Sequence, residues 1–124
     1  MKIKTSELKG RELDWAVGKA ENKEIFIGDA GNLFVTCGGF KDNKVVSFWK
    51  PTDCFATCDI LIKKNDICLS SDGQHHVASA PPHTGVTIQQ GETLLIAICR
   101  AVVAIKLGME VDIPDELVGK NDKS

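Results

Sequence analysis

The chain has 124 residues, of which 43% are hydrophobic and 26% are charged. This length predicts one globular domain, since domains commonly contain about 100–150 residues. The 15 basic and 17 acidic residues give a net charge of −2, which disfavours a nonspecific nucleic-acid or anionic-membrane surface. Only Arg11 and Arg100 are arginines, and proteins that read DNA grooves rely on arginine. Nucleic acid is therefore not the expected partner.

The N-terminal residues are polar and lack the apolar run of a signal peptide. No stretch has the length and apolarity of a transmembrane helix, so we expect a cytoplasmic protein that does not bind membranes. An odd number of cysteines in a reducing compartment favours free thiols over a disulfide framework. The five cysteines are Cys37, Cys54, Cys58, Cys68 and Cys99.

The first predicted element, after a short turn at residues 5–9, is an amphipathic helix at residues 10–21. Its apolar positions recur with helical spacing, so one face of the helix is expected to face the core. These positions are Leu13, Ala16, Val17 and Ala20. Trp15 lies off the centre of this stripe. We expect its ring to close the edge of the core, and the alternative is that it lines a groove.

The region after the first helix has extended rather than helical periodicity. Residues 24–27 and 33–37 flank the turn-rich link 28–32, a pattern typical of a β-hairpin. A third strand is predicted at residues 44–49. The glycine pair at residues 38–39 indicates a bulge or a close backbone approach.

A second hairpin is predicted beyond the break at Pro51. Residues 59–63 and 67–70 are its strands, and the chain then turns into a strand at residues 75–79. The expected fold class is α+β, an antiparallel β-meander of about five or six short strands covered by an N-terminal helix and a buried C-terminal helix.

The C-terminal helix is predicted at residues 93–107, where Arg100 and Lys106 are the only charges. A helix this apolar must be covered on most of its circumference. Glu92 and Thr93 supply an acidic charge and a cap at its start, and Gly108 is suited to its end.

After this helix, residues 111–117 are expected to wrap back over the core. The predicted domain spans residues 1–118, and residues 119–124 form a flexible polar tail.

Arg100 is the exception inside this apolar helix. An unpaired guanidinium there would be costly, so it must find a carboxylate, backbone carbonyls, a wet cavity or a bound anion. We favour a salt bridge to an aspartate, and the candidates are Asp14, Asp53 and Asp59. The alternative is an anion anchor in a ligand pocket. The candidate ligand-binding residues are Arg100, Trp15, Trp49 and Asp53.

Metal and catalytic chemistry have weaker signals. Cys54, Cys58 and His75 are side chains of the types that bind zinc, but the paired knuckles of a zinc site are absent from the sequence. We therefore expect no metal and no other cofactor. The histidines are His75, His76 and His83. They lack a nucleophile elbow or another local catalytic signature, so the sequence favours a protein that is not an enzyme.

The order of the motifs resembles the phage NinX-like proteins. The matching segments are KTSEL at 4–8, LDWAV at 13–17, PTD at 51–53, ILI at 60–62 and GETLLIA at 91–97, followed by Arg100, KLG at 106–108, Val111 and IP at 113–114. The resemblance spans nearly the whole chain. It implies an accessory protein of a bacteriophage or prophage, located in the cytoplasm of the bacterial host.

Three functions are compatible with these observations. The one we favour is a non-enzymatic accessory protein that binds a host protein through a flat surface. The alternative is a binder of a small anionic ligand, such as a nucleotide signal of host defence, with Arg100 as the anion anchor. The third is a small enzyme that uses a Cys/His pair. The sequence does not specify an oligomeric state.

Overall fold

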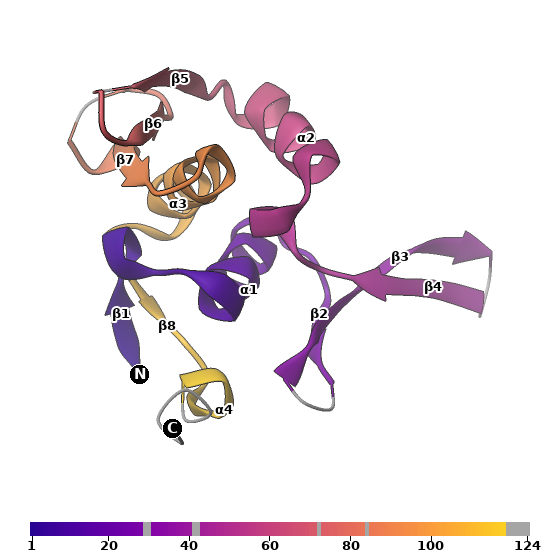
Figure 1. Cartoon of the computed structure of the whole chain (residues 1–124). Helices are drawn as coiled ribbons and strands as arrows, with labels where there is room; N and C mark the ends of the chain where they lie inside the picture. The colour runs from indigo at the N-terminus through magenta and orange to yellow at the C-terminus, as the bar shows by residue number, and fades with distance from the viewer. Residues whose placement is uncertain (29–30, 41–42, 72, 84, 119–124) are drawn as a thin grey trace.

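The structure of the chain is a computed structural model, which describes residues 1–28, 31–40, 43–71, 73–83 and 85–118 (Figure 1). The described helices are α1 (Gly10–Ala20), α2 (Phe55–Asn65), α3 (Leu94–Leu107) and α4 (Asp115–Val118). The described strands are β1 (Lys2–Lys4), β2 (Ile25–Ile27), β3 (Leu33–Phe40), β4 (Asn43–Phe48), β5 (Cys68–Ser71), β6 (His76–Ser79), β7 (Ile88–Gly91) and β8 (Glu110–Asp112). All pairs among the described strands are antiparallel, and the mixture of helices with antiparallel sheets confirms the α+β class. The predicted tail at 119–124 lies outside the described residues.

Helix α3 forms the centre of the core, as its composition predicts. Ile98 is 1% exposed, and buried residues occupy most of the helix surface. The side chain of Thr93 caps the start, since its Oγ1 accepts the N–H of Ile96 at 3.2 Å. Gly108 ends the helix with a φ of 95°, a conformation that favours glycine. Across the described residues, no helix combines the length and apolarity needed to cross a bilayer.

The sheet β5-β6-β7 packs against α3. Ala78, in the middle strand β6, is fully buried. Gly91 brings the end of β7 close to the first turn of α3, because a Cβ at this position would lie only 2.5 Å from the backbone nitrogen of Ala97. A residue without a side chain is therefore required where this sheet meets the helix.

The two ends of the described chain meet in a second, two-stranded sheet. Strand β1 pairs with β8, and Ile3 lies opposite Val111. Strand β1 was not predicted, because a three-residue strand whose partner lies far away in the sequence leaves no local pattern. The 3-10 helix Thr5–Glu7 confirms the predicted short turn. Ile113 and Leu117 are buried, which confirms that residues 111–117 wrap back over the core.

Helix α1 and the three-stranded sheet β2-β3-β4 follow the predicted order. The apolar stripe of α1 is buried, as expected. The register of β3 and β4 shifts between Cys37 and Gly39, which confirms a bulge at the glycine pair. We call β2, β3 and β4 the arm, because the β3–β4 hairpin extends away from the rest of the molecule (Figure 1).

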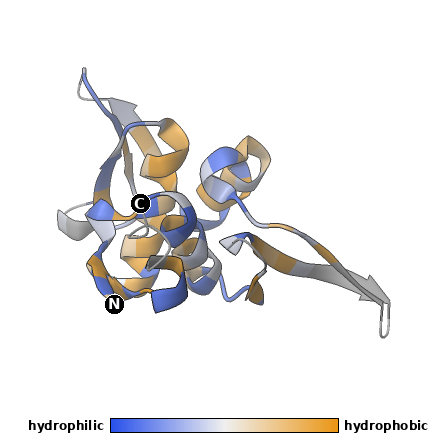
Figure 2. Ribbon diagram, turned by 60° about the horizontal axis from the view of Figure 1, so that its bottom comes forward, coloured by the Kyte–Doolittle hydropathy of each residue, from blue (hydrophilic) through white to orange (hydrophobic). Residues whose placement is uncertain are grey.

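The base of the arm is fixed to the body by apolar contacts. Leu33 and Val35 are 2% and 5% exposed and belong to the hydrophobic core. Gly18 of α1 lies so close to the arm that a Cβ there would be 2.5 Å from the Ile25 side chain. Hydrophobic positions continue from the core into the arm (Figure 2).

The predicted hairpin with strands at residues 59–63 and 67–70 is wrong for its first strand. Residues 59–63 belong to α2, which packs against α3 through Cys58 and Leu61. The apolar run at residues 60–62 is too short to distinguish a strand from a helix by periodicity. Asp66 ends the helix in the left-handed conformation, with a φ of 53°.

A single meander is therefore also wrong. Helix α2 separates the arm from the sheet β5-β6-β7, so the described strands form three small sheets rather than one. The strand predicted at 75–79 is confirmed as β6 and becomes the middle strand of its sheet.

Candidate functional site

The partly buried guanidinium of Arg100 donates hydrogen bonds to two backbone carbonyl groups. Its Nε donates to the carbonyl oxygen of Leu8 at 2.9 Å, and an Nη donates to that of Gln90 at 2.8 Å. Burial lowers the pKa of the guanidinium from its usual value, and the nearby charge of Glu92 opposes this shift. Arg100 thus connects α3 to the N-terminal segment and to β7.

The salt bridge that we favoured for Arg100 is not formed with the candidate aspartates. Asp14 accepts the Thr52 N–H at 2.9 Å, and Asp59 pairs with Lys63 of its own helix at 3.1 Å. Asp53 lies exposed in the 3-10 helix Pro51–Asp53. Backbone carbonyl groups stabilise the guanidinium of Arg100 instead. Such carbonyls were among the partners that the sequence left open for Arg100.

A hollow of about 450 Å³ lies beside Arg100. Its other lining residues are Ser6, His75, Ile88, Gln89, Gln90, Gly91 and Glu92. Trp15, Trp49 and Asp53 are not among them, so this hollow does not join the four candidate ligand-binding residues.

The two tryptophans lie elsewhere in the fold. Trp49 is 8% exposed, and its indole N–H donates to the carbonyl oxygen of Asp14 at 2.8 Å. Trp15 packs partly buried against the core, with the Lys19 ammonium 5.4 Å from its ring centroid. The expectation that Trp15 closes the edge of the core is confirmed.

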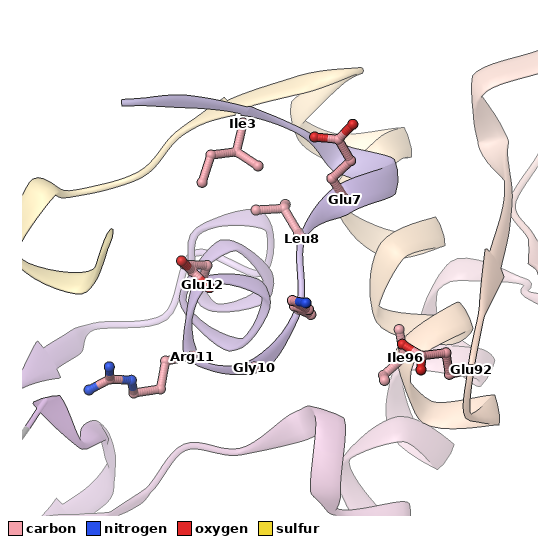
Figure 3. Close-up of a pocket in the computed structure, with 9 residues that line it drawn as sticks. Ile3, Glu7, Leu8, Gly10, Arg11, Glu12, Glu92 and Ile96 are labelled. Carbon is pink, nitrogen blue, oxygen red and sulfur yellow. The ribbon is translucent and has the colours of Figure 1, made fainter. Parts of the chain in front are cut away.

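A second hollow, of about 610 Å³, lies between the N-terminal segment and the starts of α1 and α3 (Figure 3). In this view Ile3 and Leu8 point toward each other above α1, while Glu92 and Ile96 belong to the α3 side. The charged lining residues are Glu7, Lys9, Arg11, Glu12 and Glu92. Glu92 lines both hollows. An anion near Arg100 would therefore meet a carboxylate as well as the guanidinium, which weakens the case for anion binding.

Asp14 is a buried acid where α1 meets the segment before α2. Burial raises its pKa to about 6, although the hydrogen bond from Thr52 and the charge of Lys50 act in the opposite direction. Because Asp14 is 5% exposed, its charge is poorly hydrated and depends on the Thr52 N–H for stabilisation. This carboxyl holds α1 to the 3-10 helix that precedes α2.

The weak metal candidates do not form a metal site in the described part of the chain. Cys58 Sγ donates to the carbonyl oxygen of Pro51 at 3.1 Å. Its buried neighbour Cys99 has a pKa well above the usual value, because it is hydrogen-bonded to Cys58 and desolvated. His75 lines the Arg100 hollow instead. The described residues contain no group of three or more Asp, Glu, His or Cys side chains that could hold a metal ion.

The arm carries a surface that the sequence analysis missed. In the strand register Phe26 lies opposite Phe34, and Phe34 lies opposite Phe48, so the three rings form one row across the sheet. We call Phe26, Phe34 and Phe48 the phenylalanine row. The rings of Phe34 and Phe48 stack with centroids 5.1 Å apart. Phe26 is 45% exposed and Phe48 is 63% exposed.

Two neighbours extend this surface. Val46 is 53% exposed and lies two residues from Phe48 on β4, so its side chain is on the same face of the sheet. The Lys50 ammonium lies 5.7 Å from the Phe48 ring centroid. Large apolar side chains gathered on an exposed face commonly mark an interaction site. The signal in the sequence was the alternation of Phe34 with Leu33 and Val35, which makes both faces of β3 apolar.

Helix α2 also exposes apolar side chains, namely Phe55 at 72% and Ile60 at 63%. Phe55 and Ile60 lie on a helix, so no strand pairing aligns them in a row as it does the phenylalanines. The sequence neighbours of Ile60 include the charged residues Asp59, Lys63 and Lys64. Single exposed apolar residues among charges are ordinary on protein surfaces. This helix therefore supplies control positions for tests of the phenylalanine row.

The fold and this surface define a small α+β protein with an exposed aromatic face on a projecting β-arm. Residues 4–106 match the family described as Bacteriophage P22, NinX. The chain therefore belongs to the NinX family and is a phage accessory protein, which confirms the resemblance of its motifs. A comparison with curated proteins gave no match.

Proposed function

We propose that this NinX-family protein is non-enzymatic and acts by binding a host cytoplasmic protein through the phenylalanine row. The observation that carries the proposal is the alignment of three phenylalanines on adjacent strands, with Phe48 63% exposed. Aromatic side chains are frequent anchors of protein interfaces, because each buries a large rigid surface at little entropic cost.

The binding free energy available from burial of the phenylalanine row is compatible with a specific interface. Full burial of an exposed phenylalanine contributes about 1.5–3 kcal/mol. The partly exposed row can therefore supply several kcal/mol, whereas micromolar binding needs about 8 kcal/mol. Backbone hydrogen bonds can provide more, since β4 is an edge strand of the described sheet. Addition of a strand to a sheet edge is a common mode of peptide recognition.

The charges near the row favour an acidic partner segment over a second copy of the chain. The Lys50 ammonium lies near the Phe48 ring, and residues 43–50 contain no acidic residue. The same segment of a second copy would therefore offer no carboxylate to Lys50, whereas an acidic partner segment would. The proposed partner therefore offers an extended segment with apolar side chains for the row and a carboxylate for Lys50.

Site-specific photo-crosslinking tests this proposal. A photo-reactive phenylalanine analogue replaces Val46 in protein expressed in the bacterial host, and the matched control places it at Ile60 of α2. We expect a discrete crosslinked host protein at Val46 and not at Ile60. The identified protein must then bind the purified wild-type chain. Absence of an adduct at Val46, or the same adduct at both positions, would contradict the proposal.

A second candidate function is binding of a small anionic ligand at Arg100. The hollow of about 450 Å³ beside Arg100, which His75 also lines, supports this function. The carboxylate of Glu92 lines the same hollow and would repel an anion. A cyclic dinucleotide or a nucleoside diphosphate added to the purified protein tests it. This reading expects the ligand to raise the melting temperature of the wild type and not that of Arg100→Met. If neither compound changes the melting temperature of the wild type, binding of an anionic ligand at Arg100 is excluded for these compounds.

A further inference from the structure

Cys68, Ser79 and His83 come together on the sheet β5-β6-β7. Cys68 and Ser79 are directly opposite in the antiparallel register of β5 and β6. His83 follows four residues after Ser79, and its ring lies between the two side chains. The Ser79 hydroxyl oxygen is 2.9 Å from His83 Nδ1, and Cys68 Sγ is 4.0 Å from His83 Nε2. A thiol, a base and a group that orients the base are thus placed in sequence.

This trio is open to solvent. Cys68 and His83 are exposed. Ala78 is buried against α3, so the alternation along β6 directs Ser79 to the outer face of the sheet. Ile88, which pairs with Ser79 on β7, is 44% exposed on that face. A small flexible molecule can therefore approach the thiol from outside, without a pocket opening.

We propose that Cys68 is a thiol-modification site that forms mixed disulfides with low-molecular-weight disulfides such as oxidised glutathione, with His83 as the base. This inference is independent of the proposed function, because α2 separates the arm from β5 in the fold (Figure 1). The reaction suits an open surface, since the attacking sulfur only has to approach along the axis of the disulfide bond. It also needs no stabilised oxyanion.

The exchange balances in electrons and protons. When Nδ1–H of His83 donates to the Ser79 oxygen, Nε2 has the lone pair that accepts the thiol proton. Cys68 Sγ attacks one sulfur of the disulfide, a new S–S bond forms, and the old S–S bond breaks. The departing glutathione thiolate takes the proton from His83. The small disulfide is the oxidant, and one glutathione is released in reduced form.

The other described thiols are less accessible. Cys58 and Cys99 are 1% and 0% exposed. Cys54 is half-buried, and its sulfur accepts a hydrogen bond from the Thr57 hydroxyl at 3.4 Å. Cys58 and Cys99 are therefore the internal controls. The hydrogen bond from Thr57 also lowers the pKa of the Cys54 thiol, so Cys54 is the competing thiol, and we expect Cys68 to react before it because Cys68 is more exposed and has His83 beside it.

The test treats the reduced full-length protein with oxidised glutathione between about pH 6 and pH 9, a range that brackets the usual histidine and cysteine pKa values. Peptide mass spectrometry follows the adduct at each cysteine over time. Among Cys54, Cys58, Cys68 and Cys99, we expect Cys68 to react first. His83→Asn should slow it about tenfold or more at the acidic end, where a base is needed, and little at the alkaline end, where thiolate forms unaided.

The variants are chosen to preserve the fold. His83 has a φ of 66°, and asparagine tolerates this left-handed conformation better than most residues. Ser79→Ala should slow the reaction less than His83→Asn, and Ser79→Thr should restore it, since threonine keeps the hydroxyl. Melting temperatures equal to that of the wild type establish that folding is intact. The proposal is overturned if Cys68 reacts no faster in the folded protein than in urea, or if His83→Asn leaves the pH profile unchanged.

Discussion

Helix α3 and the arm are both rich in apolar side chains, but the rest of the molecule covers them to different extents. Ile98 in α3 is 1% exposed, whereas Phe48 in the arm is 63% exposed. Helix α3 is surrounded by the sheet β5-β6-β7, α1 and α2, while the arm joins the core mainly through its base. Apolar sequence therefore leads to burial only where other elements can reach it. On the arm, the uncovered surface is available to a partner.

The largest expected effect comes from a charge in α3. Ile98→Asp should cost several kcal/mol, enough to unfold a domain of ordinary stability, because the carboxylate would be buried without a partner. The same change on the arm, Phe48→Asp, should leave the protein folded because the side chain reaches water. Circular dichroism melting curves of both variants measure the difference. Equal losses of melting temperature would show that the two regions are not distinct.

Substitutions of Arg100 test the one charged side chain in the middle of the apolar helix α3. Arg100→Met should destabilise the fold by about 3 kcal/mol, since the carbonyl groups of Leu8 and Gln90 lose charged donors. Arg100→Lys should recover only part of this loss, because one ammonium cannot reproduce the planar two-bond geometry. Guanidinium denaturation measures both values. Wild-type stability in Arg100→Met would mean that these bonds do not hold the N-terminal segment to the core.

Substitution of Asp14 tests the junction between α1 and the 3-10 helix that precedes α2. Its folded-state pKa of about 6 lies above the ordinary value of 3.8. The protonated acid therefore favours folding below about pH 4, and this contribution is lost as the pH rises through about 6. Asp14→Asn, which keeps an oxygen for the Thr52 N–H, should become more stable than the wild type by roughly 2 kcal/mol above about pH 7.

Denaturation curves of wild type and Asp14→Asn across this pH range measure that difference. The gap should be small at the acidic end and grow toward neutral pH. A constant gap would show that Asp14 does not titrate as its burial requires.

The smallest stability effect is expected in the phenylalanine row. Phe48→Ser should change the free energy of unfolding by less than about 1 kcal/mol, because its side chain is largely hydrated already, although it loses its stacking contact with Phe34. Leu33→Ser, one strand away but 2% exposed, should cost at least about 2 kcal/mol. Urea denaturation compares the two. A larger loss for Phe48→Ser would mean that the row is part of the core.

The sequence predicted α1, α3 and the arm because each has a local signal. Helical spacing defines α1, nearly continuous apolarity defines α3, and a turn-rich link with a glycine pair defines the hairpins of the arm. Helix α2 was not predicted, because Ile60, Leu61 and Ile62 suit either a strand or a helix. Pairing of β1 with β8 depends on distant segments, so no local pattern shows it.

The candidate sites depend even more on tertiary structure. Arg100 was identified as a residue that needs partners, but the choice of Leu8 and Gln90 carbonyls depends on where two other segments pass. The exposure of Phe48 depends on which elements do not cover it. The approach of His83 to Cys68 depends on the register of β5 and β6. None of these can be read from local periodicity.

The most direct test of the central claim is the affinity of the purified crosslinked partner for matched variants, measured by calorimetry. Phe48→Ser should weaken binding about tenfold or more, which corresponds to about 1.4 kcal/mol. Ile60→Ser, a similarly exposed change on α2, should leave the affinity at the wild-type value. Unchanged binding by Phe48→Ser, or an equal loss with Ile60→Ser, would contradict the assignment of the phenylalanine row as the docking surface.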